Sequence, residues 1–214
     1  MPNAISGSQT VHVVDDDEAI RDSLRMLLEA AGFAVRAHQS ATAFLAEAPG
    51  LGGCVLTDVR MPEIDGLELQ RRLNESGIRL PVIVMTGQAD IPIAVRAMKA
   101  GAIDFLEKPF DDAALLDAVR RALAESRRLL EIASVAAGAA GRLATLTPRE
   151  REVFDLLVTG LSTKAIANEL GASPRTIEVH RARVFEKLEA RSLPDLVRLM
   201  LAAEPRDTPS RYSD

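Results

Sequence analysis

The sequence is poor in cysteine and in aromatic residues, and it has no long apolar run. Cys54 is the only cysteine in 214 residues, which excludes an intrachain disulfide framework and a cysteine metal cluster and suits a reducing compartment. Tryptophan is absent, and aromatic residues make up 3% of the chain. No apolar run approaches the ~20 residues that span a bilayer, and residues 1–9 lack the basic start and apolar stretch of a signal peptide. We therefore expect a cytoplasmic protein without a membrane partner.

The composition sets broad limits on the kind of protein. A hydrophobic fraction of 47% with 27% charged residues is ordinary for a globular protein and excludes wholesale disorder. At about 150 residues per domain, the chain has room for one large domain or two small ones. The net charge of -5 argues weakly against nucleic acid as a partner, because binding to phosphate backbones favours a basic surface.

Strand-like apolar runs alternate with helix-like segments through the first part of the chain. Five such repeats predict an α/β domain, a doubly wound parallel sheet with helices on both faces. The strand-like runs are 10–14, 33–37, 54–57, 81–85 and 102–106. A helix-like segment follows each run: the first extends to residue 31, the second starts at about 42, and the others are 67–74, 91–100 and 112 to about 130.

Only helical patterns follow from Thr147 onward, which predicts a second, all-α domain. The helix-like segments are 148–159, 163–170, 174–188 and 193–203. Between the two regions Ser134–Gly141 is nearly all alanine and glycine, and Gly138 and Gly141 should weaken any helix there. We therefore expect three parts, which are an α/β domain over 10–125, a linker over 126–142 and a helical domain over 143–204.

The charge differs between the two predicted domains. Residues 1–125 carry 12 basic and 19 acidic side chains, whereas residues 126–214 carry 14 basic and 12 acidic ones. The negative net charge of the chain therefore comes from the first domain. Because the second domain is slightly basic, the net charge does not argue against nucleic acid as its partner.

Polar residues follow four of the predicted strands. Asp15 and Asp16 follow the first run, Asp58 the third, Thr86 the fourth and Lys108 the fifth. Ligands of parallel sheets bind beyond the carboxyl ends of the strands. If the strands form as predicted, these side chains converge on one edge of the sheet and make a candidate site.

The residue types at this edge suit phosphoryl transfer. Carboxylates packed together repel, and Mg²⁺, which takes one or two carboxylates and keeps its waters, removes the cost. A carboxylate can also accept a phosphoryl group and form an aspartyl phosphate. Lys108 offers the phosphate a positive charge and Thr86 a hydroxyl donor. Taken singly, the residues have structural explanations: Asp15–Glu18 could equally be acidic residues favoured at a helix start, and Asp58 could cap a turn. Their joint arrangement favours a functional site.

Four motifs resemble the receiver domain of two-component response regulators over residues 10 to about 125. They are Val14–Asp17, Thr57–Pro62 with Asp65–Gly66, Met85–Gly87 and Gly101–Phe110. The resemblance implies that Asp58 is the phosphoacceptor and that Asp15, Asp16, Asp58 and the Arg60 backbone carbonyl hold Mg²⁺.

The same resemblance implies a conformational switch. Thr86 and Phe105 would be the switch pair, and Lys108 would contact the phosphate and precede a cis peptide bond to Pro109. We expect phosphorylation to shift the populations of two existing conformations, and residues 91–100 with the fifth strand to form a dimer interface. Gln88-Ala89 stands where similar regulators usually have His-Gly, which puts the phosphoryl lifetime in doubt.

The helical domain contains the pattern of a helix-turn-helix. Thr147 is an N-cap residue with Pro148 after it and Glu150 completing a capping box, and Ser162 and Ser173 start the next two helices in the same way. A short helix, a tight turn with Gly171 and a longer helix fit a DNA-binding unit.

The longer helix has a core face and a face that suits DNA. Ile177, Val184 and Leu188 form the core stripe at about 100° per residue. Small and apolar residues on the other face can approach thymine methyl groups, and arginine can reach guanine or phosphate, although a purely structural helix stays possible on this pattern alone. We predict DNA contacts from Arg175, Thr176, Glu178, Val179, Arg181, Ala182, Arg183 and Lys187.

Three further motifs, Leu146–Val153, Gly160–Ala167 and Ser173–Ala182, resemble the four-helix output domain of LuxR/NarL-type regulators. With the receiver motifs, the chain is similar to FixJ-type regulators over nearly its whole length. Arg183 stands where asparagine is more usual, which puts the DNA preference in doubt.

The resemblance implies a regulator that is phosphorylated on Asp58 by a sensor histidine kinase, dimerises, binds two-fold promoter DNA and recruits RNA polymerase to activate transcription. Its only chemistry would be its own phosphorylation and dephosphorylation. The alternative is a Mg²⁺-dependent aspartyl-phosphate phosphatase, but such enzymes usually carry an aspartate two residues after the nucleophile, where this chain has Arg60. A third interpretation keeps the regulator and replaces DNA with RNA or protein as the output target.

Overall fold

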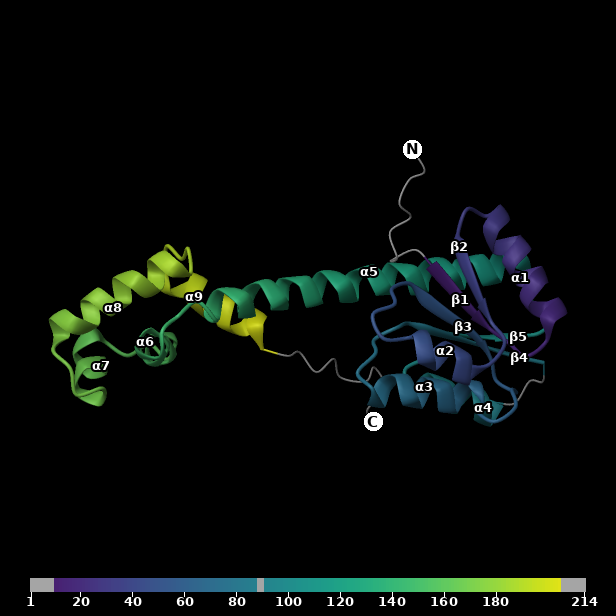
Figure 1. Cartoon of the computed structure of the whole chain (residues 1–214), viewed down its shortest axis with the longest axis horizontal. Coiled ribbons are helices and arrows are strands. Elements are labelled where there is room, and N and C mark those ends of the chain that lie inside the picture. The colour runs from purple at the N-terminus through teal and green to yellow at the C-terminus, as the bar shows by residue number, and fades with distance from the viewer. Residues whose placement is uncertain (1–9, 88–90, 205–214) are drawn as a thin grey trace. The chain divides into compact units, whose positions relative to one another are not determined.

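The computed structural model describes residues 10–87 and 91–204, which divide into two compact units, one running to Leu130 and the other starting at Glu131 (Figure 1). Each unit has its own apolar core. Among the described residues, no helix is both long and apolar enough to cross a membrane.

The first unit is built on a parallel sheet, which confirms the predicted α/β fold. Its strands pair in the order β2-β1-β3-β4-β5, and every adjacent pair is parallel. The described strands are β1 (Thr10–Val14), β2 (Ala34–His38), β3 (Cys54–Asp58), β4 (Val82–Thr86) and β5 (Asp104–Glu107). The second and fourth strands begin one residue later than predicted, and the fifth begins two residues later. The N–H groups of Phe33 and Ala102 still close the turns after the preceding helices, because they donate to the carbonyls of Leu28 and Ala97.

Helices cover both faces of this sheet. The helices are α1 (Glu18–Ala30), α2 (Ala41–Glu47), α3 (Gly66–Glu75), α4 (Ile91–Lys99) and α5 (Asp112–Leu143). On one face Leu24 and Leu28 of α1 share a core with Leu115 and Val119 of α5. The other core holds buried residues of α2, α3 and α4. The alternation of side chains along each strand sends successive residues to opposite cores.

The second unit contains the four predicted helices, α6 (Pro148–Val158), α7 (Thr163–Glu169), α8 (Pro174–Lys187) and α9 (Leu193–Ala203). The three predicted caps are confirmed, because the hydroxyls of Thr147, Ser162 and Ser173 each accept a hydrogen bond from a backbone N–H in the first turn. Ile177 and Val184 are buried in the shared core, as the helical pattern predicted.

The prediction that α5 ends near Leu130 is wrong, since the helix continues to Leu143. A Cβ atom at Gly138 or Gly141 would meet nothing within 4 Å, so neither glycine serves a close contact. Each glycine costs a helix about 1 kcal/mol relative to alanine, and the surrounding alanines, the strongest helix formers, offset that cost. Residues 126–142 are therefore helical, and their role as a linker stays a prediction.

Candidate functional site

The structure brings Asp15, Asp58, Thr86 and Lys108 to the same edge of the sheet. Asp15 follows β1, Asp58 and Thr86 end β3 and β4, and Lys108 follows β5. The Lys108 ammonium donates to Asp58 Oδ1 at 2.6 Å and to Asp15 Oδ2 at 3.0 Å. The convergence predicted from the strand ends is thus present, between residues up to 93 positions apart.

Both carboxylates are largely withdrawn from water. Asp15 is 1% exposed and Asp58 is 9% exposed. The second oxygen of Asp58, Oδ2, accepts a hydrogen bond from the Arg60 backbone N–H at 2.6 Å. Burial lowers the pKa of Lys108, but hydrogen bonds to Asp58 and Asp15 outweigh that effect and hold the pKa above its ordinary value. A charged ammonium therefore stands between two buried carboxylates.

The neighbouring acidic residues divide into exposed and structural ones. Asp16 is exposed beside the site. The carboxylate of Asp17 instead caps α1, accepting from the backbone N–H groups of Ala19 and Ile20, and Asp65 caps α3 in the same way. The helix-start explanation thus holds for Asp17, while Asp15 belongs to the site.

The donor atoms at this edge fit Mg²⁺. Within residues 10–87 and 91–204, no group of three or more His, Cys, Asp or Glu side chains is arranged to hold a metal ion. Mg²⁺ does not require such a group, because one or two carboxylates, a carbonyl and water complete its shell. Asp15 and Asp58 supply two buried carboxylates that already converge on one cation, the Lys108 ammonium.

Thr86 and Phe105 lie on neighbouring strands near the acidic edge. Thr86 is 1% exposed, and its backbone oxygen accepts from the Lys108 N–H at 2.6 Å. Phe105 is half-buried and packs against the core that α4 covers, beside Val84 on β4. The peptide bond from Lys108 to Pro109 is cis, as the resemblance implied.

Helix α4 has one face in the core and one in solvent. Ile93 and Met98 pack against the core and Ala97 is buried, whereas Ile91 is 76% exposed and Val95 46% exposed. A purely structural role therefore accounts for Ile93 and Met98 and leaves the other two apolar side chains in water. The departure at Gln88-Ala89 lies outside the described residues.

The face of α8 that is predicted to contact DNA (the recognition face) is open to solvent. Val179 is 48% exposed, and the remaining residues predicted to contact DNA are exposed as well. Three of them also make contacts within the domain, and the first is Thr176, whose hydroxyl lies 2.8 Å from that of Ser173. Arg181 donates to the Thr163 hydroxyl at 3.3 Å and lies over the Phe185 ring, and Lys187 donates to Glu150 Oε2 at 2.6 Å. The sequence pattern did not indicate the contacts of Arg181 and Lys187.

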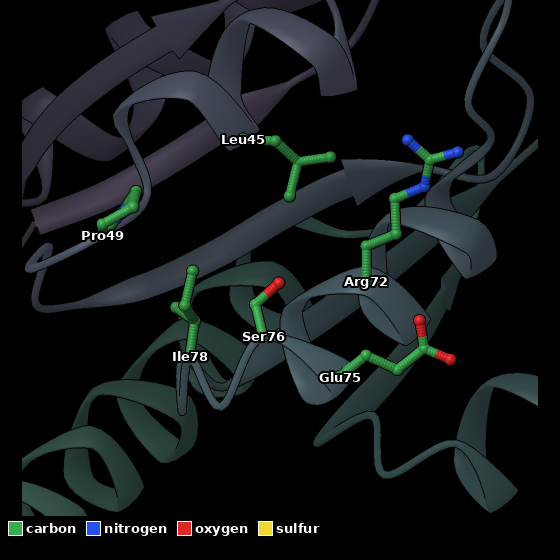
Figure 2. Close-up of a pocket in the computed structure, with 6 residues that line it drawn as sticks. All are labelled: Leu45, Pro49, Arg72, Glu75, Ser76 and Ile78. Carbon is green, nitrogen blue, oxygen red and sulfur yellow. The ribbon is translucent and has the colours of Figure 1, made fainter.

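An open pocket of about 360 Å³ lies at the end of α3 that points away from the acidic edge. Figure 2 shows the six side chains that line it, Leu45, Pro49, Arg72, Glu75, Ser76 and Ile78. Its charged groups are paired along α3, Arg72 with Glu68 at 2.8 Å and Glu75 with Arg71. The pocket therefore presents no free charge to a ligand and contains none of the predicted site residues.

Two family models match the chain, each over one of the predicted domains. Residues 11–120 match the response regulator receiver domain, and residues 144–200 match the bacterial regulatory proteins of the luxR family.

Whole-length relatives show the same order of domains. The chain is 54% identical to the transcriptional regulatory protein FixJ of Azorhizobium caulinodans over 197 residues, covering 92% of this chain and 93% of that protein. It is 50% identical to FixJ of Bradyrhizobium diazoefficiens, covering 90% of this chain and 95% of that protein.

Among solved structures, the response regulator StyR matches with a TM-score of 0.78 and 42% identity, covering 90% of this chain and 98% of that one. Full-length FixJ from B. japonicum matches with a TM-score of 0.56 and 48% identity, covering 91% of this chain and 97% of that one. The chain therefore belongs to the FixJ family of two-component response regulators, transcriptional regulators in which a receiver domain precedes a LuxR-type DNA-binding domain.

Proposed function

We propose that a sensor histidine kinase phosphorylates this regulator on Asp58, and that the phosphorylated chain dimerises, binds promoter DNA and recruits RNA polymerase to activate transcription. The observation that carries the proposal is the pair of buried carboxylates, Asp15 and Asp58, bridged by the Lys108 ammonium. The family matches cover both domains and give no support to the phosphatase alternative.

The phosphoryl transfer follows from the surroundings of Asp58. A carboxylate oxygen attacks the phosphorus of the kinase phosphohistidine, an O–P bond forms, and the P–N bond breaks with its electron pair returning to the imidazole, which takes a proton. Lys108 neutralises charge on the phosphoryl oxygens, and the Arg60 N–H orients the carboxylate. Mg²⁺, bound by Asp15, Asp16, Asp58 and the Arg60 carbonyl, would add further neutralisation. The chain's own chemistry is limited to gaining and losing this phosphoryl group.

The conformational response begins at the new charge. A phosphoryl group adds acceptor oxygens and about -1.5 to -2 charges, to which the Thr86 hydroxyl can donate. Drawing the end of β4 toward Asp58 makes room for Phe105, which lies on the next strand. Both residues adjoin the core covered by α4, whose exposed Ile91 and Val95 then pair with a second copy. Phosphorylation thus shifts the population toward the dimer.

The output domain then reads DNA through α8. The proposed contacts are Arg175, Thr176, Glu178, Val179, Arg181, Ala182, Arg183 and Lys187, all exposed. Residues 126–214 have only two more basic than acidic side chains, so one domain has little electrostatic affinity for DNA. Two copies on a two-fold site supply two recognition helices.

The test is acetyl-phosphate-dependent dimerisation, measured by light scattering on the full chain. Asp58→Asn should stay monomeric. Asp17→Asn is the matched control, because asparagine also caps helices and Asp17 lies outside the site; this variant should dimerise like the wild type. Dimerisation of the Asp58→Asn variant on the same treatment would refute the mechanism, and repeated turnover of a phosphomonoester would favour the phosphatase. Mobility shifts on duplex DNA and on RNA, with Val179→Ala and Arg183→Ala compared, separate the possible output targets.

A further inference from the structure

Lys187 points its ammonium into its own domain. It donates to Glu150 Oε2 at 2.6 Å and to the Thr145 backbone oxygen at 3.2 Å. The Lys187 side chain is 35% exposed, whereas that of Glu150 is 3% exposed. The ion pair is therefore anchored on a buried carboxylate, unlike the surface pairs elsewhere in the domain.

Glu150 depends on this ammonium for its charge balance. Its carboxylate also accepts from the Thr147 N–H at 2.9 Å and closes the capping box of α6. The hydrogen bond from Lys187, followed by that from the Thr147 backbone, lowers the pKa of Glu150 to about 2, so the carboxylate is ionised at neutral pH. If Lys187 left to contact a DNA phosphate, an ionised and buried group would lose the only charged hydrogen-bond donor that it has among the described residues, which is strongly unfavourable.

The contact joins three segments of the output domain. Glu150 stands in the first turn of α6, Lys187 in the last turn of α8, and Thr145 in the connection that follows α5. The start of α8 is fixed separately by the Ser173 cap. The Glu150–Lys187 pair, together with the buried Val184 and Leu188, therefore holds the C-terminal end of the recognition helix.

We propose that Lys187 is a positioning residue that holds α8 at the DNA-reading angle through Glu150, and that it makes no phosphate contact. This inference rests on the proposed DNA-binding function and removes one residue from its list of contacts. It also gives Glu150, an acidic residue away from the recognition face, a role in DNA affinity.

The two possible roles of Lys187 predict opposite effects for Glu150→Gln. If Lys187 bound phosphate, removing the competing carboxylate would free it and strengthen DNA binding. If the pair orients α8, Glu150→Gln and Lys187→Met should both weaken binding, each by roughly ten-fold, and the double variant should be no weaker than either single variant. Each phosphate contact contributes about 0.9 to the slope of log K against log salt. Because the proposal gives Lys187 no phosphate contact, this slope should be the same in the wild type, the two single variants and the double variant.

The experiment uses the phosphorylated full chain and a labelled duplex that the wild type selects from a random pool, with anisotropy followed over a salt series. Arg175→Met is the control, because this exposed arginine in the first turn of α8 should reduce the slope by ~0.9. Tighter binding by Glu150→Gln, or a reduced slope for Lys187→Met, would overturn the proposal.

Unfolding of the same proteins by urea tests the contact without DNA. The two single variants should lower the midpoint of the output domain, and the double variant should lower it no further; additive losses would show that the pair is not coupled and would overturn the proposal. A wild type that selects no duplex would instead refute DNA binding, while these midpoints still report on the pair. Lys187→Arg keeps a cation near Glu150, so its DNA affinity and its urea midpoint should be close to those of the wild type. This variant replaces Lys187→Met in the test if Lys187→Met fails to fold.

Discussion

Replacing Lys108 with methionine should leave two buried carboxylates without their shared counter-charge. The ammonium lies 2.6 Å from Asp58 Oδ1 and 3.0 Å from Asp15 Oδ2, so together these distances put the two oxygens no more than about 5.6 Å apart. Two unit charges at that separation repel by roughly 3 kcal/mol at an effective dielectric constant of about 20. This is also the lower end of the cost of breaking a buried ion pair. We therefore expect the variant to lose about 3 kcal/mol of receiver stability at neutral pH.

Cys54 provides a probe of the receiver alone. It is the single cysteine in the sequence, it is fully buried in β3, and burial raises its pKa to about 12. Its thiol should therefore react with a maleimide only when the receiver opens. The labelling rate of Lys108→Met without Mg²⁺ should rise by about two orders of magnitude, the factor that corresponds to 3 kcal/mol.

Adding Mg²⁺ should reverse most of this loss, because a bound cation replaces the missing charge and stabilises the folded state by mass action. The wild type should gain less, since Lys108 already neutralises the pair. Lys99→Met, which removes an exposed lysine of α4, should change stability by less than about 0.5 kcal/mol. A loss below about 1 kcal/mol in Lys108→Met, or equal gains from Mg²⁺ in both proteins, would refute the electrostatic reasoning.

Three other predictions concern stability. In Gly66→Ala the new Cβ would lie 2.2 Å from the backbone oxygen of Asp58, which should cost the receiver about 1–3 kcal/mol in urea unfolding. Gly138→Ala, whose Cβ would meet nothing within 4 Å, should instead stabilise α5 by ~1 kcal/mol. Glu189 has a φ of 53°, so Glu189→Gly should raise the melting temperature of the output domain by relieving ~1 kcal/mol of strain. Burial lowers the pKa of His12 and of His38 below 6.5, so the unfolded chain binds more protons than the folded one. The receiver should therefore lose stability as the pH falls below about 6.5, measured as a lower urea midpoint.

Most of the architecture could be predicted from short-range pattern. The apolar runs and their alternation with helical segments give all the described strands of the sheet, and the N-caps Thr147, Ser162 and Ser173 give three helix starts, because caps act over three residues. The acidic edge was predictable for a different reason. The topology of a parallel sheet places the carboxyl end of every strand on one side, so Asp58 and Lys108 had to lie along the same edge.

Contacts that depend on tertiary packing could not be predicted from the sequence pattern. Asp15 and Asp17 look alike in sequence, yet one lies in the site and the other caps α1. The Lys187 contact to Glu150 joins residues 37 positions apart with no signal at either end. The glycines near the end of α5 predict a helix that is too short, because the alanines around Gly138 and Gly141 favour the helix enough to carry it on to Leu143.

The burial of Leu143 bears on how such regulators are recombined. Leu143 is the last residue of α5, and it fills the core of the output domain together with Phe154 and Ile166. The matching luxR-family segment begins one residue later, at 144. In a chimera joined at residue 144, Leu143 would come from the protein that supplies the receiver, although its side chain packs in the core of the output domain. Exchange of receivers between relatives, in the laboratory or over evolutionary time, therefore has to carry the last turn of the helix with the output domain.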